Sequence, residues 1–270
     1  MYNRVPKCGS RSMKERLEAY GKQGNYSFSE IPNLPHRVSP RQQMKTVYYV
    51  LKNKTKPRHA WVAHKYFFDH VGNYNGQLVW MNVLRDPVER FISDFYWLRR
   101  GTDANRLMLQ ITRGSFEEEE NLDLNKCTPE GHPSCTWTAW PPGELQLTYL
   151  CGTNESCVQR GNKWALQRAK YNIAKYYGVV GILEELPLSL AVMEAYIPVF
   201  FKIHKRIRAS SIATHARNSD VKKPVSNVTR NILRNNLKED YELYKYAQQR
   251  LHLQAAAAGI DAKANVYKRL

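Results

Sequence analysis

The chain has 270 residues, of which 43% are hydrophobic and 11% are aromatic. This length and composition exclude a disordered chain and suit one large domain with a substantial core. The formal net charge of +17 and the pI of about 9.7 predict attraction to polyanions such as nucleic acid, anionic membranes or acidic polysaccharides. A generally basic, soluble protein without such a partner is the alternative.

The N-terminal part of the sequence predicts one strand and two helices. The strand lies at about residues 2–5, and a loop of small and basic residues, PKCGSRS, follows it. A helix is expected from about residue 12 to 21. Residues 24–45 have the composition of a polar connection that contains proline, and a helical stretch follows near residues 42–52.

Two further strands precede the next helix. The segment HAWVAHKYFFDH contains a strand-like run, and GQLVWMNVL at residues 76–84 predicts a third strand. The third strand ends at Arg85-Asp86-Pro87, where the proline is typical of the first turn of a helix. That helix places four apolar side chains on one face: Phe91, Ile92, Phe95 and Leu98.

The second half of the sequence begins with an irregular segment at about residues 101–159. Helix resumes at NKWALQRAKYNIAKYY, GVVGIL predicts a fourth strand, and LSLAVMEAYIPVFF predicts a buried helix. A long helix from about residue 228 to 257 ends the ordered body, and a tail reaches residue 270. Strands that alternate with helices predict an α/β fold with a mostly parallel central sheet flanked by helices, as a single domain over residues 1–270.

Four of the five cysteines lie in the irregular segment: Cys127, Cys135, Cys151 and Cys157. Their spacings do not match zinc sites, which favour two cysteines separated by two to four residues. Two short disulfide loops fit better and indicate an oxidising compartment. Glycosylation sequons support secretion weakly; they are at Asn25, Asn53, Asn154 and Asn227.

The loop PKCGSRS has the order of strand, small-residue loop and helix in which backbone N–H groups and a helix N-terminus meet an anion. Lys7 adds a positive charge, and Ser10 and Ser12 add hydroxyl donors. The spacing matches neither a Walker loop nor a dinucleotide-binding glycine motif. A plain helix cap with basic neighbours is the alternative.

A second candidate anion site lies at the end of the third strand. Arg85 closes that strand, and Ser93 follows two turns into the next helix. Two anion sites at neighbouring strand ends suit a nucleotide that is phosphorylated at both ends. As an alternative, Arg85 forms an ordinary ion pair with Asp86 or Glu89 at the start of the helix.

Several stretches, in order from residue 2 to about residue 250, resemble the 2-O-sulfotransferases of glycosaminoglycan uronic acids. They are YNRVPKCGSRS, NVLRDPVERFISDFYWLR, WALQRAKYN and VVGILEEL, together with the cysteine loops. KCGSR and LDLNKC look closest to the uronyl 2-O-sulfotransferase branch, which includes the insect Pipe proteins. The resemblance implies a P-loop-like sulfotransferase domain that uses 3′-phosphoadenosine 5′-phosphosulfate as donor.

The resemblance assigns donor-binding roles to three groups of residues. The 5′-phosphosulfate loop corresponds to Lys7, Gly9, Ser10, Arg11 and Ser12. The 3′-phosphate site corresponds to Arg85 and Ser93. A late basic loop that closes over the nucleotide corresponds to Arg217, Ser219 and Lys222.

The resemblance also assigns the catalytic groups. His64 matches the family's catalytic histidine, and a histidine suits this role because its pKa lies near working pH. Lys7 would stabilise the charge on the leaving phosphate, and Arg4 is expected to touch the sulfuryl group or the acceptor carboxylate. Val62 stands where heparan-type members carry another histidine, which weighs against heparan specificity. A buried histidine with only a structural role is the alternative for His64.

The implied function is transfer of a sulfuryl group to the 2-hydroxyl of a uronic acid, with dermatan or chondroitin favoured as acceptor. The alternatives are a heparan sulfate 2-O-sulfotransferase and a non-catalytic polyanion-binding module. We expect no metal, an acidic polysaccharide or glycoprotein glycan as partner rather than nucleic acid, and a homotrimer. The expected location is the Golgi lumen, as a type II membrane protein whose anchor is absent from this chain. The short spacings and the family's pairing predict the disulfides Cys127–Cys135 and Cys151–Cys157.

Overall fold

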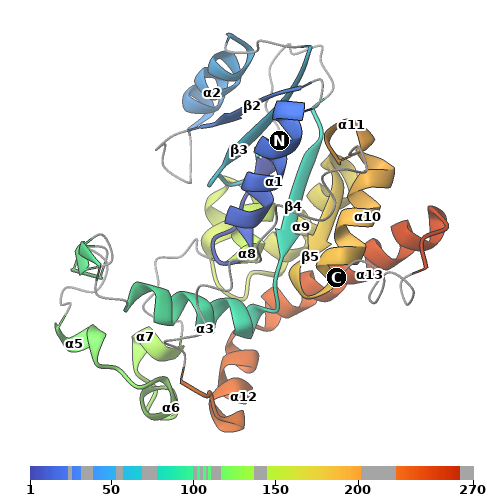
Figure 1. Ribbon diagram of the computed structural model, residues 1–270. Helices are drawn as coiled ribbons and strands as arrows, with labels where there is room; N and C mark the ends of the chain where they lie inside the picture. Colours follow the sequence, from blue (N-terminus) through green and yellow to red (C-terminus); the bar gives the residue numbers. More distant parts are fainter. Residues whose placement is uncertain are drawn as a thin grey trace.

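The computed structural model describes residues 1–23, 26–31, 39–52, 57–68, 78–99, 117–136, 145–201 and 223–261, with 102–103, 106–107 and 109–110. Within these residues a parallel sheet has the strand order β2-β3-β1-β4-β5 and is flanked by helices (Figure 1). This confirms the predicted α/β class. The strands are β1 Tyr2–Asn3, β2 Tyr26–Glu30, β3 Arg58–Ala63, β4 Trp80–Leu84 and β5 Tyr177–Ile182. The longer helices are α1 Ser10–Gln23, α2 Pro40–Lys52, α3 Pro87–Leu98, α9 Lys163–Tyr176, α10 Leu186–Tyr196, α12 Asn227–Asn236 and α13 Lys238–Ala257.

The register of the sheet brings the three loops that carry predicted site residues to one edge. β1 lies between β3 and β4, with Tyr2 opposite Val62 on one side and Met81 on the other. Because every strand pair is parallel, the carboxyl ends of β1, β3 and β4 meet at the same edge. Immediately beyond β1, the backbone N–H of Arg4 donates to the carbonyl of Ala63 over 2.9 Å.

Helices cover the two faces and one side of the sheet. α1 lies on one face with α10 and with α11, Pro198–Phe201 (Figure 1). The other face is covered by α8, Gln146–Cys151, and by α9, whereas α13 runs along the β5 side. Aromatic rings fill the core beneath α9: Phe67 and Trp80 have ring centres 5.0 Å apart, and Trp80 and Tyr177 have ring centres 6.0 Å apart.

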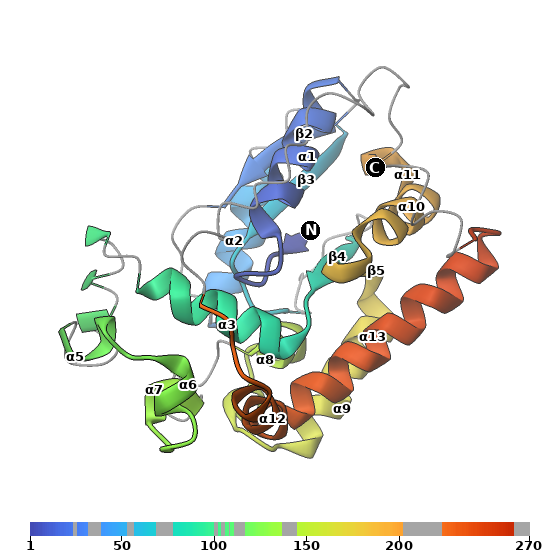
Figure 2. The same cartoon turned by 60° about the horizontal axis from the view of Figure 1, so that its bottom comes forward.

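A smaller lobe packs against the outer face of α3, opposite the sheet (Figure 2). It contains the short helices α5 Glu117–Glu120, α6 Leu124–Cys127 and α7 Pro133–Thr136, and it joins α12 through a buried apolar cluster. Glu119 of the acidic run is buried in this lobe and pairs with Arg99. The disulfide Cys127–Cys135 closes the lobe, and Cys151–Cys157 joins α8 to η1, Glu155–Val158. Both disulfide predictions are confirmed.

Three predictions about elements are wrong in instructive ways. The polar connection predicted at residues 24–45 contains β2, whose half-exposed YSFSE sequence lacks a long apolar run because β2 is an edge strand. The predicted helix over LSLAVMEAYIPVFF breaks at Ile197, because Pro198 cannot continue the hydrogen-bond ladder. The long helix predicted over 228–257 is divided at Leu237, whose buried side chain packs in the apolar cluster between α3 and the small lobe.

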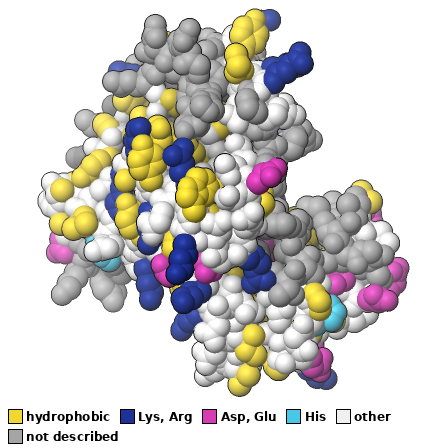
Figure 3. Space-filling model, turned by 180° about the vertical axis from the view of Figure 1, so that it is seen from behind, with side chains coloured by type: hydrophobic (Ala, Val, Ile, Leu, Met, Phe, Trp, Pro, Cys, Tyr) yellow, Lys and Arg dark blue, Asp and Glu magenta, His cyan; other side chains and the backbone are white. Residues whose placement is uncertain are grey.

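The surface is uneven in charge and polarity. On the side opposite the view of Figure 1, Lys and Arg side chains lie among hydrophobic ones over the helices that back the sheet, whereas acidic side chains gather on the small lobe (Figure 3). None of the helices in the described residues is long and apolar enough to cross a membrane.

Candidate active site

The loop after β1 has a backbone shape suited to an anion. Lys7 and Gly9 both have left-handed backbone angles, with φ of 65° and 68°. The left-handed conformation favours glycine at position 9, and a Cβ there would also lie 2.6 Å from Cδ1 of Leu183 and force that side chain to shift. Directly afterwards, α1 begins at Ser10, two residues earlier than predicted. The N–H groups of its first turn therefore border the loop.

The predicted donor-loop residues differ in exposure. Ser10 is buried, Ser12 is half-buried and Arg11 is exposed. Lys7 is half-buried, and its ammonium lies 5.1 Å from the centre of the Trp97 ring. A cation held over an aromatic face is restricted in position while remaining charged.

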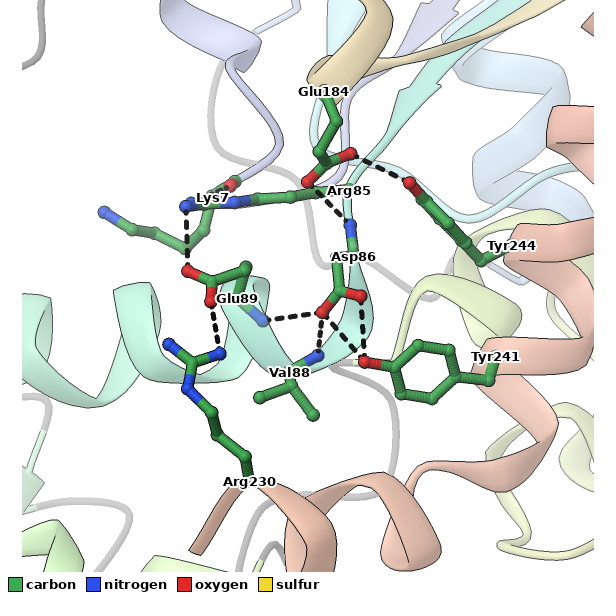
Figure 4. Close-up of polar contacts among 9 residues, drawn as sticks. All are labelled: Lys7, Arg85, Asp86, Val88, Glu89, Glu184, Arg230, Tyr241 and Tyr244. Atoms are coloured by element: carbon green, nitrogen blue, oxygen red, sulfur yellow. Dashed lines mark hydrogen bonds and ion pairs between the residues drawn. The ribbon is translucent and has the colours of Figure 1, made fainter. Parts of the chain in front are cut away.

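The structure brings the two predicted anion elements into contact. The Nη1 of Arg85 donates to the carbonyl oxygen of Lys7 over 3.2 Å (Figure 4). Its Nη2 lies 3.9 Å from Glu89, so the ion pair considered as an alternative is also present, at long range. Glu89 makes a much closer pair with Arg230, at 2.6 Å. Ser93 lies on α3 and is 2% exposed.

Asp86 has a structural role at the start of α3. Its carboxylate accepts from the backbone N–H groups of Val88 and Glu89, at 2.9 and 3.0 Å, and caps the helix (Figure 4). The Tyr241 hydroxyl donates to the same carboxylate over 2.9 Å. Burial raises the pKa of Tyr241 to about 12, and the Asp86 charge contributes to the rise. Glu184, after β5, accepts from the Asp86 backbone N–H over 2.9 Å.

His64 follows β3 and is oriented by the β1 loop. Its Nδ1 lies 3.0 Å from the backbone carbonyl of Arg4. Because a carbonyl oxygen only accepts, Nδ1 carries the hydrogen in the neutral ring and Nε2 carries the lone pair. Since the side chain is half-buried, Nε2 can serve as a proton acceptor at the sheet edge.

Arg4 lies beside His64 and belongs to a cluster of ion pairs. Its Nη1 donates to Glu30 over 2.7 Å, and Lys14 binds the other oxygen of the same carboxylate. Burial opposes the charge on Glu30, but the hydrogen bond from Lys14 and the charges of Lys14 and Arg4 keep its pKa below the ordinary value. The Nε of Arg4 is buried and has no hydrogen-bond partner among the described residues. One N–H group of this guanidinium is therefore buried without an acceptor in the described part of the chain.

Gln146 is a site residue that the sequence reasoning missed. It begins α8, it is fully buried, and its amide bonds to the backbone of Arg85 and to the Cys8 thiol. The one sequence signal was a polar residue at the start of the apolar run QLTYLC. Such a residue has no reason to be buried unless its amide is hydrogen-bonded.

The remaining predicted residues, Arg217, Ser219 and Lys222, lie outside the described residues. Among the residues that are described, no group of three or more His, Cys, Asp or Glu side chains could hold a metal ion.

Comparison with known proteins agrees with this arrangement. The sulfotransferase family matches residues 1–247. The chain belongs to the sulfotransferase family. This chain is 31% identical to the uronyl 2-sulfotransferase homolog pip of Drosophila melanogaster, over 95% of this chain and 52% of that protein. It is 31% identical to the uronyl 2-sulfotransferase of Homo sapiens, over 97% of this chain and 64% of that protein.

A heparan-type relative is also similar to this chain. Heparan sulfate 2-O-sulfotransferase 1 of Xenopus laevis is 28% identical over 99% of this chain and 74% of that protein. The chain thus spans about half to two thirds of the length of the two uronyl-type relatives. The resemblance inferred from the sequence motifs is confirmed.

Proposed function

We propose that this protein is an enzyme that transfers a sulfuryl group from 3′-phosphoadenosine 5′-phosphosulfate to the 2-hydroxyl of a uronic acid in a glycosaminoglycan. The observation that carries the proposal is the contact between Arg85 and the Lys7 carbonyl, at the same sheet edge as His64. The names of the relatives support the acceptor position, and their uronyl members support a dermatan or chondroitin chain. Val62 in β3, where heparan-type members carry histidine, supports the same choice.

The residues present fit a donor with an anionic group at each end. The loop before α1 offers N–H groups, Gly9 allows the left-handed backbone of that loop, and the buried Nε–H of Arg4 has no acceptor among the described residues. Arg85 and Ser93 would hold the 3′-phosphate, and Lys7, Ser10, Arg11 and Ser12 the 5′-phosphosulfate. The donor supplies an activated sulfuryl group, and no metal is needed in this scheme.

In the proposed mechanism the chain's own groups move one proton and stabilise one charge. Nε2 of His64 accepts the proton of the acceptor hydroxyl. At the same time the hydroxyl oxygen forms a bond to sulfur, and the bond between sulfur and the phosphate oxygen of the donor breaks. Lys7 stabilises the negative charge that develops on that phosphate oxygen. Arg4, next to His64, would bind the sulfuryl oxygens or the acceptor carboxylate.

The proposed setting follows from charge and cysteine chemistry. The net charge of +17 favours an acidic polysaccharide or glycoprotein glycan as acceptor, and we propose no nucleic acid partner. Two disulfides support an oxidising lumen, for which we propose the Golgi. A homotrimer is part of the proposal, and light scattering on the purified protein would measure it.

Mass spectrometry of products tests the proposal. The protein is incubated with the sulfo donor or with ATP, together with dermatan, chondroitin, heparan or glycoprotein glycan acceptors. We expect a sulfate added at a uronic acid 2-hydroxyl, with dermatan or chondroitin preferred and no phosphate transfer from ATP. Exclusive modification of heparan would favour the alternative that the protein is a heparan sulfate 2-O-sulfotransferase. Binding of every chain without transfer would favour a non-catalytic polyanion-binding module.

A further inference from the structure

The buried amide of Gln146 joins the two loops that carry the predicted donor residues. Its Oε1 accepts from the Arg85 backbone N–H over 2.9 Å and from the Cys8 thiol over 3.3 Å. Its Nε2 donates to the Arg85 carbonyl over 2.8 Å. One side chain on α8 therefore contacts the loop after β1 and both backbone polar groups of the residue after β4.

Gln146 is itself fixed by its surroundings. Its backbone N–H and that of Leu147 donate to the two carboxylate oxygens of Asp240 on α13, over 3.3 and 2.9 Å. Gln146 and Asp240 are both buried, and α8 ends at the disulfide-bonded Cys151. The amide thus reaches the two loops from a position set by two other segments of the chain, α13 and η1.

We propose that Gln146 is a positioning residue that holds the two donor loops at a fixed separation, so that a nucleotide phosphorylated at both ends is bound as one unit. The inference rests on the proposed donor. Two anion sites held at the correct distance bind a two-headed ligand far more tightly than either site binds one head, because the second contact costs little additional entropy. Loss of the amide should therefore lower the affinity for a nucleotide with two phosphate groups more than the affinity for a nucleotide with one.

The test compares two nucleotides by calorimetry. For Gln146→Leu we expect affinity for adenosine 3′,5′-bisphosphate to fall about tenfold or more, the equivalent of one or two hydrogen bonds. Affinity for adenosine 5′-monophosphate should change by less than about threefold. If Gln146→Leu does not fold, Gln146→Glu serves in its place, since it keeps the acceptor for the Arg85 N–H and replaces the donor to the Arg85 carbonyl.

Gln254→Leu is the matched control. Gln254 is also a largely buried amide bonded to a backbone carbonyl, that of Gly178 over 2.8 Å, but near the opposite edge of the sheet. Its loss should lower thermal stability and leave the ratio of the two nucleotide affinities unchanged. Equal losses for both nucleotides in the Gln146 variant, or no loss, would overturn the inference. Failure of the unaltered protein to bind the bisphosphate would instead count against the proposed function.

A second, independent observation concerns the outer face of α9. Trp164, Arg168, Tyr171 and Lys175 follow one another at spacings of three or four residues, and α9 contains no Asp or Glu. The guanidinium of Arg168 and the ammonium of Lys175 each lie 5.3 Å from the centre of the Tyr171 ring. Lys175 also donates to the Tyr171 hydroxyl over 2.9 Å. We call these four residues the α9 stripe.

The α9 stripe leads away from the candidate active site across the back of the molecule. The segment before α9 lies near the strand ends, where Arg160 donates to the carbonyl of Asn236 over 3.1 Å. The end of α9 leads into Tyr177, which pairs with Trp80 at the start of β4. The stripe therefore extends about 16 Å from one edge of the sheet towards the other. Basic and hydrophobic side chains share this face (Figure 3).

We infer that the α9 stripe binds an acidic polysaccharide chain outside the active site. Its cations match sulfate or carboxylate groups, its exposed Trp164 ring offers an apolar face to a sugar ring, and the ring of Tyr171 restricts the motion of two cations. The class of ligand rests on the proposed function. A long chain would reach both the stripe and the active site, whereas a short one would reach only the active site.

Polysaccharide binding is measured without donor on the stripe variant Arg168→Gln/Lys175→Gln. The control, Arg41→Gln/Lys45→Gln, removes the same charge at exposed positions of α2. We expect affinity for long dermatan sulfate to fall about tenfold more in the stripe variant. Hexasaccharide binding should be equal in the two variants. Equal losses of long-chain binding would overturn the inference. So would a loss confined to anionic vesicles or a change of oligomeric state, since these indicate a lipid surface or an interface between copies. Absence of sulfuryl transfer by the unaltered protein would count only against the proposed function.

Discussion

The ends of β1 and β4 and the ends of β2 and β3 lie at the same edge of the sheet, but different interactions hold them. At β1 and β4, a buried neutral amide, that of Gln146, satisfies both backbone groups of Arg85. At the end of β2, Glu30 forms ion pairs with Arg4, just beyond β1, and with Lys14 of α1, and these side chains are between 13% and 41% exposed. Buried hydrogen bonds fix a geometry, whereas exposed ion pairs are weak and yield to salt.

This difference suits a site with two kinds of ligand. A nucleotide of constant shape benefits from a rigid cradle, because the entropy of ordering is lost before it binds. A polymer that must enter and leave benefits from a rim whose charged side chains exchange partners easily. We therefore refer to a donor half at β1 and β4 and an acceptor half at β2 and β3, and the following variants test the distinction.

The largest effect is expected for His64→Ala in the acceptor half. Turnover should fall by about 10²–10⁴, the usual contribution of a positioned general base. Donor affinity should stay close to that of the unaltered protein, because the anion loops lie after β1 and β4. Turnover assays beside calorimetric donor titrations measure both, with His252→Ala, an exposed histidine on α13, as control. An active and well-folded His64→Ala protein would remove His64 from the mechanism.

Lys7→Ala should affect both binding and turnover, since Lys7 lies in the donor half and is proposed to stabilise the charge on the leaving phosphate oxygen. We expect a loss of about 10- to 100-fold in donor affinity, typical of a hydrogen bond to a charged group, and a further loss in turnover. Lys22→Ala, an exposed lysine in the last turn of α1, is the control for charge alone. Unchanged donor affinity would place Lys7 outside the cradle.

Removing each disulfide in turn should show that the donor half and the small lobe depend on different disulfides. Each short loop contributes about 2–3 kcal/mol through the unfolded chain, so Cys151→Ala/Cys157→Ala and Cys127→Ala/Cys135→Ala should both unfold at lower denaturant concentration. Only the first pair should also weaken donor binding, because Cys151 ends the helix that carries Gln146. Equal donor affinities in the two variants would contradict the division.

The smallest effect is expected for Glu30→Gln in the acceptor half, below about 1 kcal/mol of unfolding free energy, as for exposed ion pairs. The pKa of Glu30 is lowered in the folded protein, so its stabilisation is present above the unfolded pKa and is lost as pH falls through the folded pKa. Urea unfolding of both proteins should show a constant difference from about pH 5 to 8 that shrinks below about pH 4. A difference that grows in acid would reverse this assignment.

The sequence predicts the buried strands better than the edge strand β2. The strands β3, β4 and β5 are buried along most of their length and appear as apolar runs, and the PKCGSRS loop is local in sequence. The strand β2 alternates polar and apolar residues at an edge, so its pattern resembles a connection. Leu237 divides α12 from α13 through tertiary packing, which no local propensity indicates.

Local sequence patterns could not predict the hydrogen-bond partners of the site residues, because these partners are distant in the chain. Gln146 is 61 residues from Arg85 and 138 from Cys8, and Glu30 is 26 from Arg4. A sequence pattern shows which side chains carry charge or hydrogen-bond donors. The distances between them are set by the register of parallel strands whose crossovers are long.

The left-handed backbone at Lys7 has a consequence for directed evolution of this protein. A residue other than glycine in this conformation costs on the order of 1–3 kcal/mol, which glycine at the same position would not incur. A library selected only for resistance to heat should therefore enrich Lys7→Gly, and a library selected for sulfuryl transfer should retain lysine. Stability and activity thus compete at one position, and thermostable descendants of this chain need their gains elsewhere.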